Sequence, residues 1–189
     1  TGRYVQFELF TLNFQEYEEM KAFFGKPINP NPMIELTNYI LEGGFPRAVL
    51  FDDMADKRKY VQDVISEIFE KDIRKRLKIK NKETFEIIRK YIINNFGATT
   101  SLNNICEAIR KNGTPINTST ISKYVKALID AKILYECPRF DMKSKRSLSG
   151  EKKYYLADLS FYYAENTDNK INYGPVLENI VYIYAKSLD

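Results

Sequence analysis

The sequence contains no histidine, and this absence removes several classes of enzyme from consideration. A Ser-His-Asp triad, a Cys-His pair and nearly all catalytic zinc sites use imidazole as a base or as a metal ligand. Neither a G-x-x-x-x-G-K-S/T phosphate loop nor a G-x-G-x-x-G fingerprint is present. The carboxylates are scattered rather than paired, as with Asp52-Asp53, which stand where a helix start favours acids. We therefore expect no catalytic residue and no metal site in this chain.

Long apolar runs and targeting signals are also missing. No run of eighteen apolar residues and no signal-peptide pattern occurs, so nothing in the sequence places the chain in a membrane. Cys106 and Cys137 lie far apart in apolar patterns, which predicts two buried, reduced thiols and a cytoplasmic protein. With 44% hydrophobic and 14% aromatic residues, the 189-residue chain is expected to bury a core. A net charge of +4 permits nucleic-acid contact without arguing for it strongly.

The stretch from Asn81 to Asp158 is predicted to be a winged helix-turn-helix. Apolar residues recur at helical spacing over three segments, residues 83–96, 101–111 and 117–131. Two β-rich runs, 133–137 and 153–156, flank a polar loop over 141–151 and predict a hairpin. Three helices followed by a hairpin with a basic loop give the winged-helix order, with the third helix in the recognition position.

Cations on the predicted wing and recognition helix are candidates for contact with double-stranded DNA. They are Lys123, Lys126, Lys143, Lys145, Arg146, Lys152 and Lys153. After Asn117 the third helix has no Arg, Asn or Gln, the side chains that discriminate bases best. We therefore expect contacts to the DNA backbone rather than sequence-specific readout. The alternative is a winged helix that serves as a packing and relay module.

The first eighty residues predict a strand followed by helices. Alternation over Arg3–Phe10 indicates a strand that pairs with the hairpin edge, with another chain or with a sheet outside this chain. Helices are expected over 14–24, 33–41 and 53–78, and another over 175–188. Taken alone, Gly43-Gly44-Phe45-Pro46 predicts a turn between the second and third of these helices. The basic run from Lys71 to Lys82 fits either a solvated helix end or a phosphate-contacting patch.

The order of several short motifs resembles one protein family. The motifs are Gly43-Gly44-Phe45-Pro46, Asp72-Ile73-x-x-Arg76, Lys153-Tyr154-Tyr155 and Leu177-Glu178-Asn179. In this order they resemble prokaryotic AAA-type ATP-binding proteins with a domain of unknown function behind the ATPase core. That family has a phosphate-loop ATPase domain, whose last strand Gly2-Arg3 to Phe10 resembles, then a helical lid and a winged helix. Its Leu-Glu-Asn segment leads into a domain similar to restriction-type nucleases.

The resemblance implies that Gly44-x-Pro46 is similar to a glycine-x-proline element whose proline lies against adenine. Arg3 and Arg47 are then candidate phosphate sensors, because a guanidinium pairs with phosphate oxygens through two hydrogen bonds. The implied nucleotide site comprises Arg3, Gly43, Gly44, Phe45, Pro46 and Arg47. ATP and magnesium belong to the whole family protein, and none is expected on this chain alone, which lacks the phosphate loop. Asp158-Leu159-Ser160-Phe161 departs from the family's Asp-Leu-Gly-Leu.

These observations predict a mainly α chain with a small β-hairpin. The predicted parts are a last core strand over 1–13, a helical lid over 14–80, a winged helix over 81–160 and a C-terminal helix over 161–189. Both flanking domains of the family are expected to lie outside this chain. The function implied is regulatory, with the lid coupling nucleotide state to a partner or DNA. The alternatives are a free-standing winged-helix DNA-binding regulator and a protein-interaction module.

Overall fold

The computed structural model describes residues 7–74, 81–141, 146–166 and 168–188, and it is mainly helical with one two-stranded antiparallel sheet. This confirms the predicted fold class. The first part of the chain contains α1 (Phe14–Phe23), α2 (Pro32–Glu42), α3 (Pro46–Val49), α4 (Met54–Ile68) and the π turn η1 (Phe69–Ile73). We call the part from α1 to η1 the lid region, after its predicted role. Within the described residues, no helix is both long enough and apolar enough to cross a membrane.

The middle of the chain forms a three-helix region with a hairpin. Its elements are α6 (Lys82–Asn94), α7 (Leu102–Lys111), α8 (Thr118–Asp130), β1 (Leu134–Asp141) and β2 (Arg146–Leu156). The strands pair from Leu134 opposite Leu156 outward, with an irregularity between Pro138 and Phe140. Helix α9 (Ser160–Tyr163) follows directly, and α10 (Tyr173–Ser187) ends the described chain. The order of elements is the one predicted for a winged helix.

Side-chain caps fix where most helices begin. In each case an Asn, Asp or Ser oxygen accepts a hydrogen bond from a backbone N–H in the first turn, which would otherwise lack a partner. The capping residues are Asn13, Asn31, Asp53, Asn81, Ser101 and Asn117. At Asn13 the cap is reciprocal, because Glu16 accepts from the Asn13 N–H in return. Such local signals explain why the helix starts could be predicted to within one or two residues.

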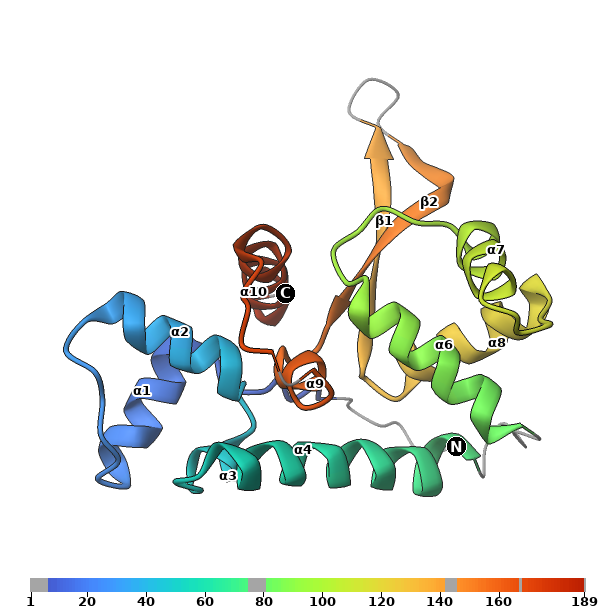
Figure 1. The fold of residues 1–189 in the computed structure, drawn as a ribbon. Helices are drawn as coiled ribbons and strands as arrows, with labels where there is room; N and C mark the ends of the chain where they lie inside the picture. Colours follow the sequence, from blue (N-terminus) through green and yellow to red (C-terminus); the bar gives the residue numbers. More distant parts are fainter. Residues whose placement is uncertain (1–6, 75–80, 142–145, 167, 189) are drawn as a thin grey trace, which may run out of the picture.

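One hydrophobic core joins the lid region to the three-helix region. It includes Ile40 of α2 and Val61 of α4 together with buried residues of α6, α7, α8, the hairpin and α9. Figure 1 shows α4 running beneath α9 and toward α6, and the rings of Phe69 and Phe85 meet there at 4.9 Å. The two regions therefore share one core.

Helix α1 is attached differently, through a buried polar network of Tyr17, Lys21, Glu35, Glu42 and Lys57. Lys21 pairs with Glu35, and the Tyr17 hydroxyl donates to Glu42 at 2.8 Å. Lys57 of α4 pairs with the same Glu42. The network thus ties α1, α2 and α4 together by directional contacts.

The free edge of β2 is covered by three different partners. Lys152 exchanges backbone hydrogen bonds with Thr100, and the Tyr154 carbonyl accepts from Gly97 N–H. The Asn179 side chain of α10 bonds both the N–H and the C=O of Leu156, at 2.8 and 2.9 Å. Figure 1 shows the hairpin rising between α10 on one side and α7 and α8 on the other.

Three expectations need correction. The strand predicted over Arg3–Phe10 is not formed over Phe7–Phe10, because no strand lies beside it in the described chain to supply hydrogen bonds. The helix predicted over 53–78 leaves α geometry at Phe69, and residues 75–80 lie outside the described residues. Cys137 is half-buried, whereas Cys106 is buried as expected; neither is in a disulfide.

Candidate functional site

The Gly43-Gly44 turn lies at the junction of the lid region and the hairpin. Gly43 has φ +78°, a conformation that side-chain-bearing residues rarely adopt. A Cβ built on Gly43 would lie 2.1 Å from Asp158 Oδ1, and one on Gly44 would lie 2.2 Å from the Leu12 carbonyl oxygen. Leu12 N–H also donates to the Gly44 carbonyl at 2.8 Å. Both glycines are therefore required by close contacts within the chain.

Asp158 holds this turn from the hairpin side. Its side chain is buried, and Oδ2 accepts from Gly44 N–H at 2.8 Å while Oδ1 accepts from Ser160 N–H at 2.8 Å. Burial raises the pKa of the Asp158 carboxyl, and these backbone hydrogen bonds act against that rise. The carboxylate therefore connects residues that are 114 positions apart in the chain.

The residues after the glycines divide into a half-buried aromatic ring and an exposed pair. The Phe45 ring makes edge-to-face contacts with Phe161 of α9 at 5.5 Å and with Tyr60 of α4 at 6.3 Å. Pro46 and Arg47, the first residues of α3, are exposed, and the Arg47 guanidinium lies 6.0 Å from the centre of the Tyr60 ring. Of the predicted nucleotide-site residues that the structure describes, Pro46 and Arg47 are thus the exposed ones. Arg3 lies outside the described residues.

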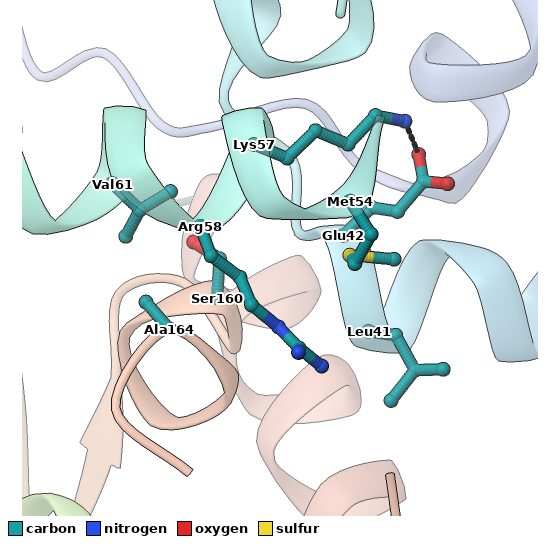
Figure 2. Close-up of a pocket in the computed structure, with 8 residues that line it drawn as sticks. All are labelled: Leu41, Glu42, Met54, Lys57, Arg58, Val61, Ser160 and Ala164. Atoms are coloured by element: carbon teal, nitrogen blue, oxygen red, sulfur yellow. Dashed lines mark hydrogen bonds and ion pairs between the residues drawn. The ribbon is translucent and has the colours of Figure 1, made fainter. Parts of the chain in front are cut away.

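A narrow pocket lies behind the turn, between the end of α2, the start of α4 and α9 (Figure 2). Figure 2 shows Lys57 reaching Glu42 while Arg58 leaves α4 in another direction. The pocket has no room for a water molecule, so it offers no cavity for a ligand.

The predicted DNA-contacting cations differ in how they are used within the chain. Lys126 pairs with Asp130, Lys152 with Glu136 and Lys153 with Glu178. Lys123 of α8 is exposed and makes no ion pair among the residues that the structure describes. Lys143 and Lys145 lie outside the described residues. Arg146 begins β2, where its backbone pairs with Asp141.

Two motifs that the sequence analysis singled out contact each other. Glu178 of α10 accepts from Lys153 Nζ at 2.5 Å and from the Tyr155 hydroxyl at 2.8 Å. These contacts hold the pKa of the Glu178 carboxyl below its usual range, with the Lys153 hydrogen bond as the main cause. The Tyr155 and Tyr182 rings stack at 4.2 Å. Lys153-Tyr154-Tyr155 and Leu177-Glu178-Asn179 are therefore the two sides of one joint between β2 and α10.

Neither Asp158 nor Asn179 was predicted to link distant parts of the chain. Both are buried polar side chains at 4% and 2% exposure, and each bonds backbone groups far away in the sequence. A polar residue flanked by apolar ones, as in Leu156-Ala157-Asp158-Leu159, was the available signal. It does not reveal the distant partner.

Comparison with known proteins finds relatives of greater length. The chain is 28% identical over 187 residues to Uncharacterized protein MJ1544 of Methanocaldococcus jannaschii, covering 96% of this chain and 42% of that protein. It is 26% identical over 183 residues to an Uncharacterized protein of Haemophilus influenzae, covering 97% of this chain and 45% of that protein. The chain thus spans less than half the length of these curated relatives. No solved structure matches the chain significantly.

A family model with the description Domain of unknown function (DUF8612) matches residues 33–172. The matched stretch runs from the start of α2 to the loop before α10, so it contains the Gly43-Gly44 turn, Asp158 and the whole three-helix region. Since the match covers well over half of the sequence, the chain belongs to the DUF8612 family.

Proposed function

We propose that this chain is the lid and winged-helix portion of an AAA-type ATP-binding protein, and that it couples nucleotide state to a partner or to DNA. The arrangement of Pro46 and Arg47 carries the proposal. Both are exposed at the start of α3, while the residues immediately before them are fixed against the hairpin end by Asp158 and Phe161. A ligand at this surface would therefore act on a turn that is attached to both regions.

The N-terminal segment supports the same proposal. Glu8 pairs with Lys132 at 2.8 Å and accepts from the Tyr135 hydroxyl, and Phe10 stacks on Tyr135. The neighbouring Phe7 and Leu9 are 84% and 94% exposed. Large exposed apolar side chains close together mark a surface for a partner, and a sheet of an ATPase core fits this role.

ATP and magnesium would be held mainly by that core. This chain would contribute the flat face of Pro46 toward the base and the Arg47 guanidinium toward phosphate oxygens. Gly43 and Gly44 would contribute indirectly, since both are buried against the chain itself. A cytoplasmic location accompanies the proposal.

Binding of a fluorescent ATP analogue to the whole encoded protein tests it. Pro46→Ala and Arg47→Ala should each weaken binding about tenfold, because each would remove a contact to the nucleotide. Matched controls are Pro30→Ala, in the exposed loop before α2, and Arg74→Ala, an exposed arginine paired with Glu70. Unchanged affinity in both Pro46→Ala and Arg47→Ala would remove the proposed nucleotide site.

A second candidate, a winged-helix regulator that contacts the DNA backbone, is favoured by Lys123. This lysine is exposed on α8, the helix in the recognition position, and no acid of the described chain neutralises it. The test is binding of random-sequence duplex DNA across a salt series, where each phosphate neutralised adds about −0.9 to the log–log slope. Lys123→Ala should flatten the slope, whereas Lys153→Ala should change it less because Glu178 already pairs with Lys153. No binding at low salt would exclude this candidate.

A further inference from the structure

The segment Asp158-Leu159-Ser160-Phe161 is not part of the proposed nucleotide site, although it occupies a central place in the fold. It links the end of β2 to α9, and Asp158 lies in it as a buried carboxylate. No lysine or arginine of the described chain forms an ion pair with Asp158. A buried carboxylate without a cation is unfavourable unless hydrogen bonds satisfy its oxygens. Here Gly44 N–H and Ser160 N–H satisfy one oxygen each.

The shape of the turn matches this carboxylate closely. The space that a side chain on Gly43 would need is filled by Asp158 Oδ1 and by Ser160 Cβ, at 2.1 and 2.5 Å from the ideal Cβ position. On the other side, the Leu12 backbone fills the corresponding space at Gly44. The turn is therefore clamped between residue 12 and residue 158.

A second contact, between aromatic rings, joins the same two segments as the Asp158–Gly44 hydrogen bond. Three residues after Asp158, the Phe161 ring packs on Phe45, which directly precedes Pro46. The chain from Gly44 to Phe45 is thus held at a backbone N–H and at an aromatic ring by the same short segment. Both contacts end immediately before the exposed residues Pro46 and Arg47.

We propose that Asp158 is a positioning residue that sets the Gly43–Phe45 turn, and with it Pro46 and Arg47, relative to the hairpin and the three-helix region. A displacement of the turn then reaches the end of β2 through the Asp158–Gly44 hydrogen bond. The part that concerns nucleotide rests on the proposed function, whereas the positioning of the turn does not.

The variant Asp158→Asn tests the positioning role. The amide keeps the size of the carboxylate, but one of the two backbone N–H donors then faces an NH₂ group instead of an acceptor. Amide hydrogen exchange at Gly44 and over 47–50 should become about tenfold faster or more, as expected for the loss of a hydrogen bond to a charged group. Exchange at Ile92 and Leu128, deep in the three-helix core, should not change. Asp168→Asn, at an exposed aspartate, is the matched control.

Two outcomes would overturn the positioning role. One is unchanged exchange at Gly44 and over 47–50, and the other is a uniform acceleration that includes Ile92 and Leu128. If Asp158→Asn does not fold, the wild-type protein can be tested instead. NMR can measure a scalar coupling across the hydrogen bond from Gly44 N–H to the Asp158 carboxylate. Its presence supports the role and its absence overturns it.

Nucleotide affinity separates this inference from the proposed function. In the whole encoded protein, Asp158→Asn should weaken ATP-analogue binding although Asp158 itself is buried away from solvent. Wild-type affinity in the variant, together with faster exchange at the turn, would overturn the link to nucleotide. If the wild-type protein binds no nucleotide, the proposed function fails, and the exchange result still decides whether Asp158 positions the turn.

Discussion

The attachment of α1 to α2 and the packing of α6, α7 and α8 rely on different interactions. Between α1 and α2 lies the buried ion pair of Lys21 and Glu35, at 9% and 0% side-chain exposure. Glu35 also accepts hydrogen bonds from Asn29 N–H and from the Asn38 amide. The contacts among the three helices are instead mainly apolar, and the side chains with 2% exposure or less include Phe85, Ile88, Ile92, Ile105, Ile109, Ile121 and Leu128. The buried charge of α6, Arg89, pairs with Glu86 of the same helix and with Glu165 after α9, not with α7 or α8.

This difference has consequences for how each region responds to change. An apolar core loses stability in proportion to the volume removed and tolerates small shifts of its neighbours. A buried ion pair depends on both partners being present and correctly placed, since either charge alone is strongly unfavourable. The α1–α2 end should therefore be the part in which orientation is specified most sharply.

The largest effect is expected for Glu35→Ala. It leaves the Lys21 ammonium buried without a carboxylate, and breaking a buried pair in this way costs about 3–5 kcal/mol. Urea denaturation measures the loss, with Glu19→Ala on the exposed face of α1 as the control. A loss below about 1 kcal/mol would show that the pair is not desolvated as the structure indicates.

The double variant Lys21→Met with Glu35→Leu tests whether the instability of Glu35→Ala comes from the unpaired Lys21 charge. Replacing both charges by apolar groups of similar size should recover most of the stability lost in Glu35→Ala. A double variant as unstable as Glu35→Ala would mean that Glu35 acts mainly through Asn29 and Asn38 instead.

Leu128→Ala should have the next largest effect. Leu128 of α8 is fully buried, and truncation to alanine in such a core costs about 2–5 kcal/mol. Ser122→Ala, at an exposed position of the same helix, should be nearly neutral in the same urea titration. The loss from Leu128→Ala should also be independent of pH between 3 and 7, since no charge is involved; a pH-dependent loss would contradict the apolar description of this core.

Two carboxyls should give opposite pH dependences of a smaller size. The hydrogen bonds from Lys21, Asn29 and Asn38 outweigh burial, which acts in the opposite direction, and hold the pKa of Glu35 below its usual value. Glu35 therefore adds stability above that usual value, and this stability is lost as the pH falls through the lowered pKa. The pKa of Asp158 is raised by burial, so its contribution falls as the pH rises from the usual aspartate pKa toward the raised one.

Urea midpoints of the wild type, Glu35→Gln and Asp158→Asn across this pH range measure both effects. The deficit of Glu35→Gln relative to wild type should shrink on the acid side. The stability of Asp158→Asn relative to wild type should increase as the pH rises. Parallel curves for the two variants would contradict the assigned directions.

The smallest effect is expected for Lys126→Ala. Lys126 and Asp130 form an ion pair on α8 with side chains that are 74% and 52% exposed. Exposed pairs four residues apart on a helix contribute about 0.3–0.5 kcal/mol, and salt screens them. A change above about 1 kcal/mol in urea denaturation would show that charge alone, without burial, governs stability in this chain.

The fold was predictable where its signals are local. Apolar spacing located the three helices, and the flanking β-rich runs located the hairpin. The structure adds the capping residues, such as Ser101 and Asn117, at which these helices start. The hairpin strands are longer than predicted, because the pairing continues to polar residues that carry no β signal, such as Lys152 and Ser147. The short helix α3 was missed, since four residues give no periodicity.

The candidate site was predictable only in part. Gly43-Gly44-Phe45-Pro46 was recognisable as a turn, but Asp158 as its partner was not, because a contact across 114 residues leaves no spacing in the sequence. Likewise, Lys152 and Lys153 had the charge expected of a DNA-contacting wing. Their acid partners Glu136 and Glu178 come from β1 and α10, and only the folded chain brings them together.

The most direct test of the proposed coupling is hydrogen exchange of the whole encoded protein with ADP and with a non-hydrolysable ATP analogue. We expect the two nucleotides to protect residues 44–50 to different extents. The difference should extend through Asp158 to α9 and the Leu156 end of β2, which Asp158 and Phe161 connect to the turn. Equal exchange at both places, with both nucleotides bound, would contradict the claim that this turn links nucleotide state to the three-helix region.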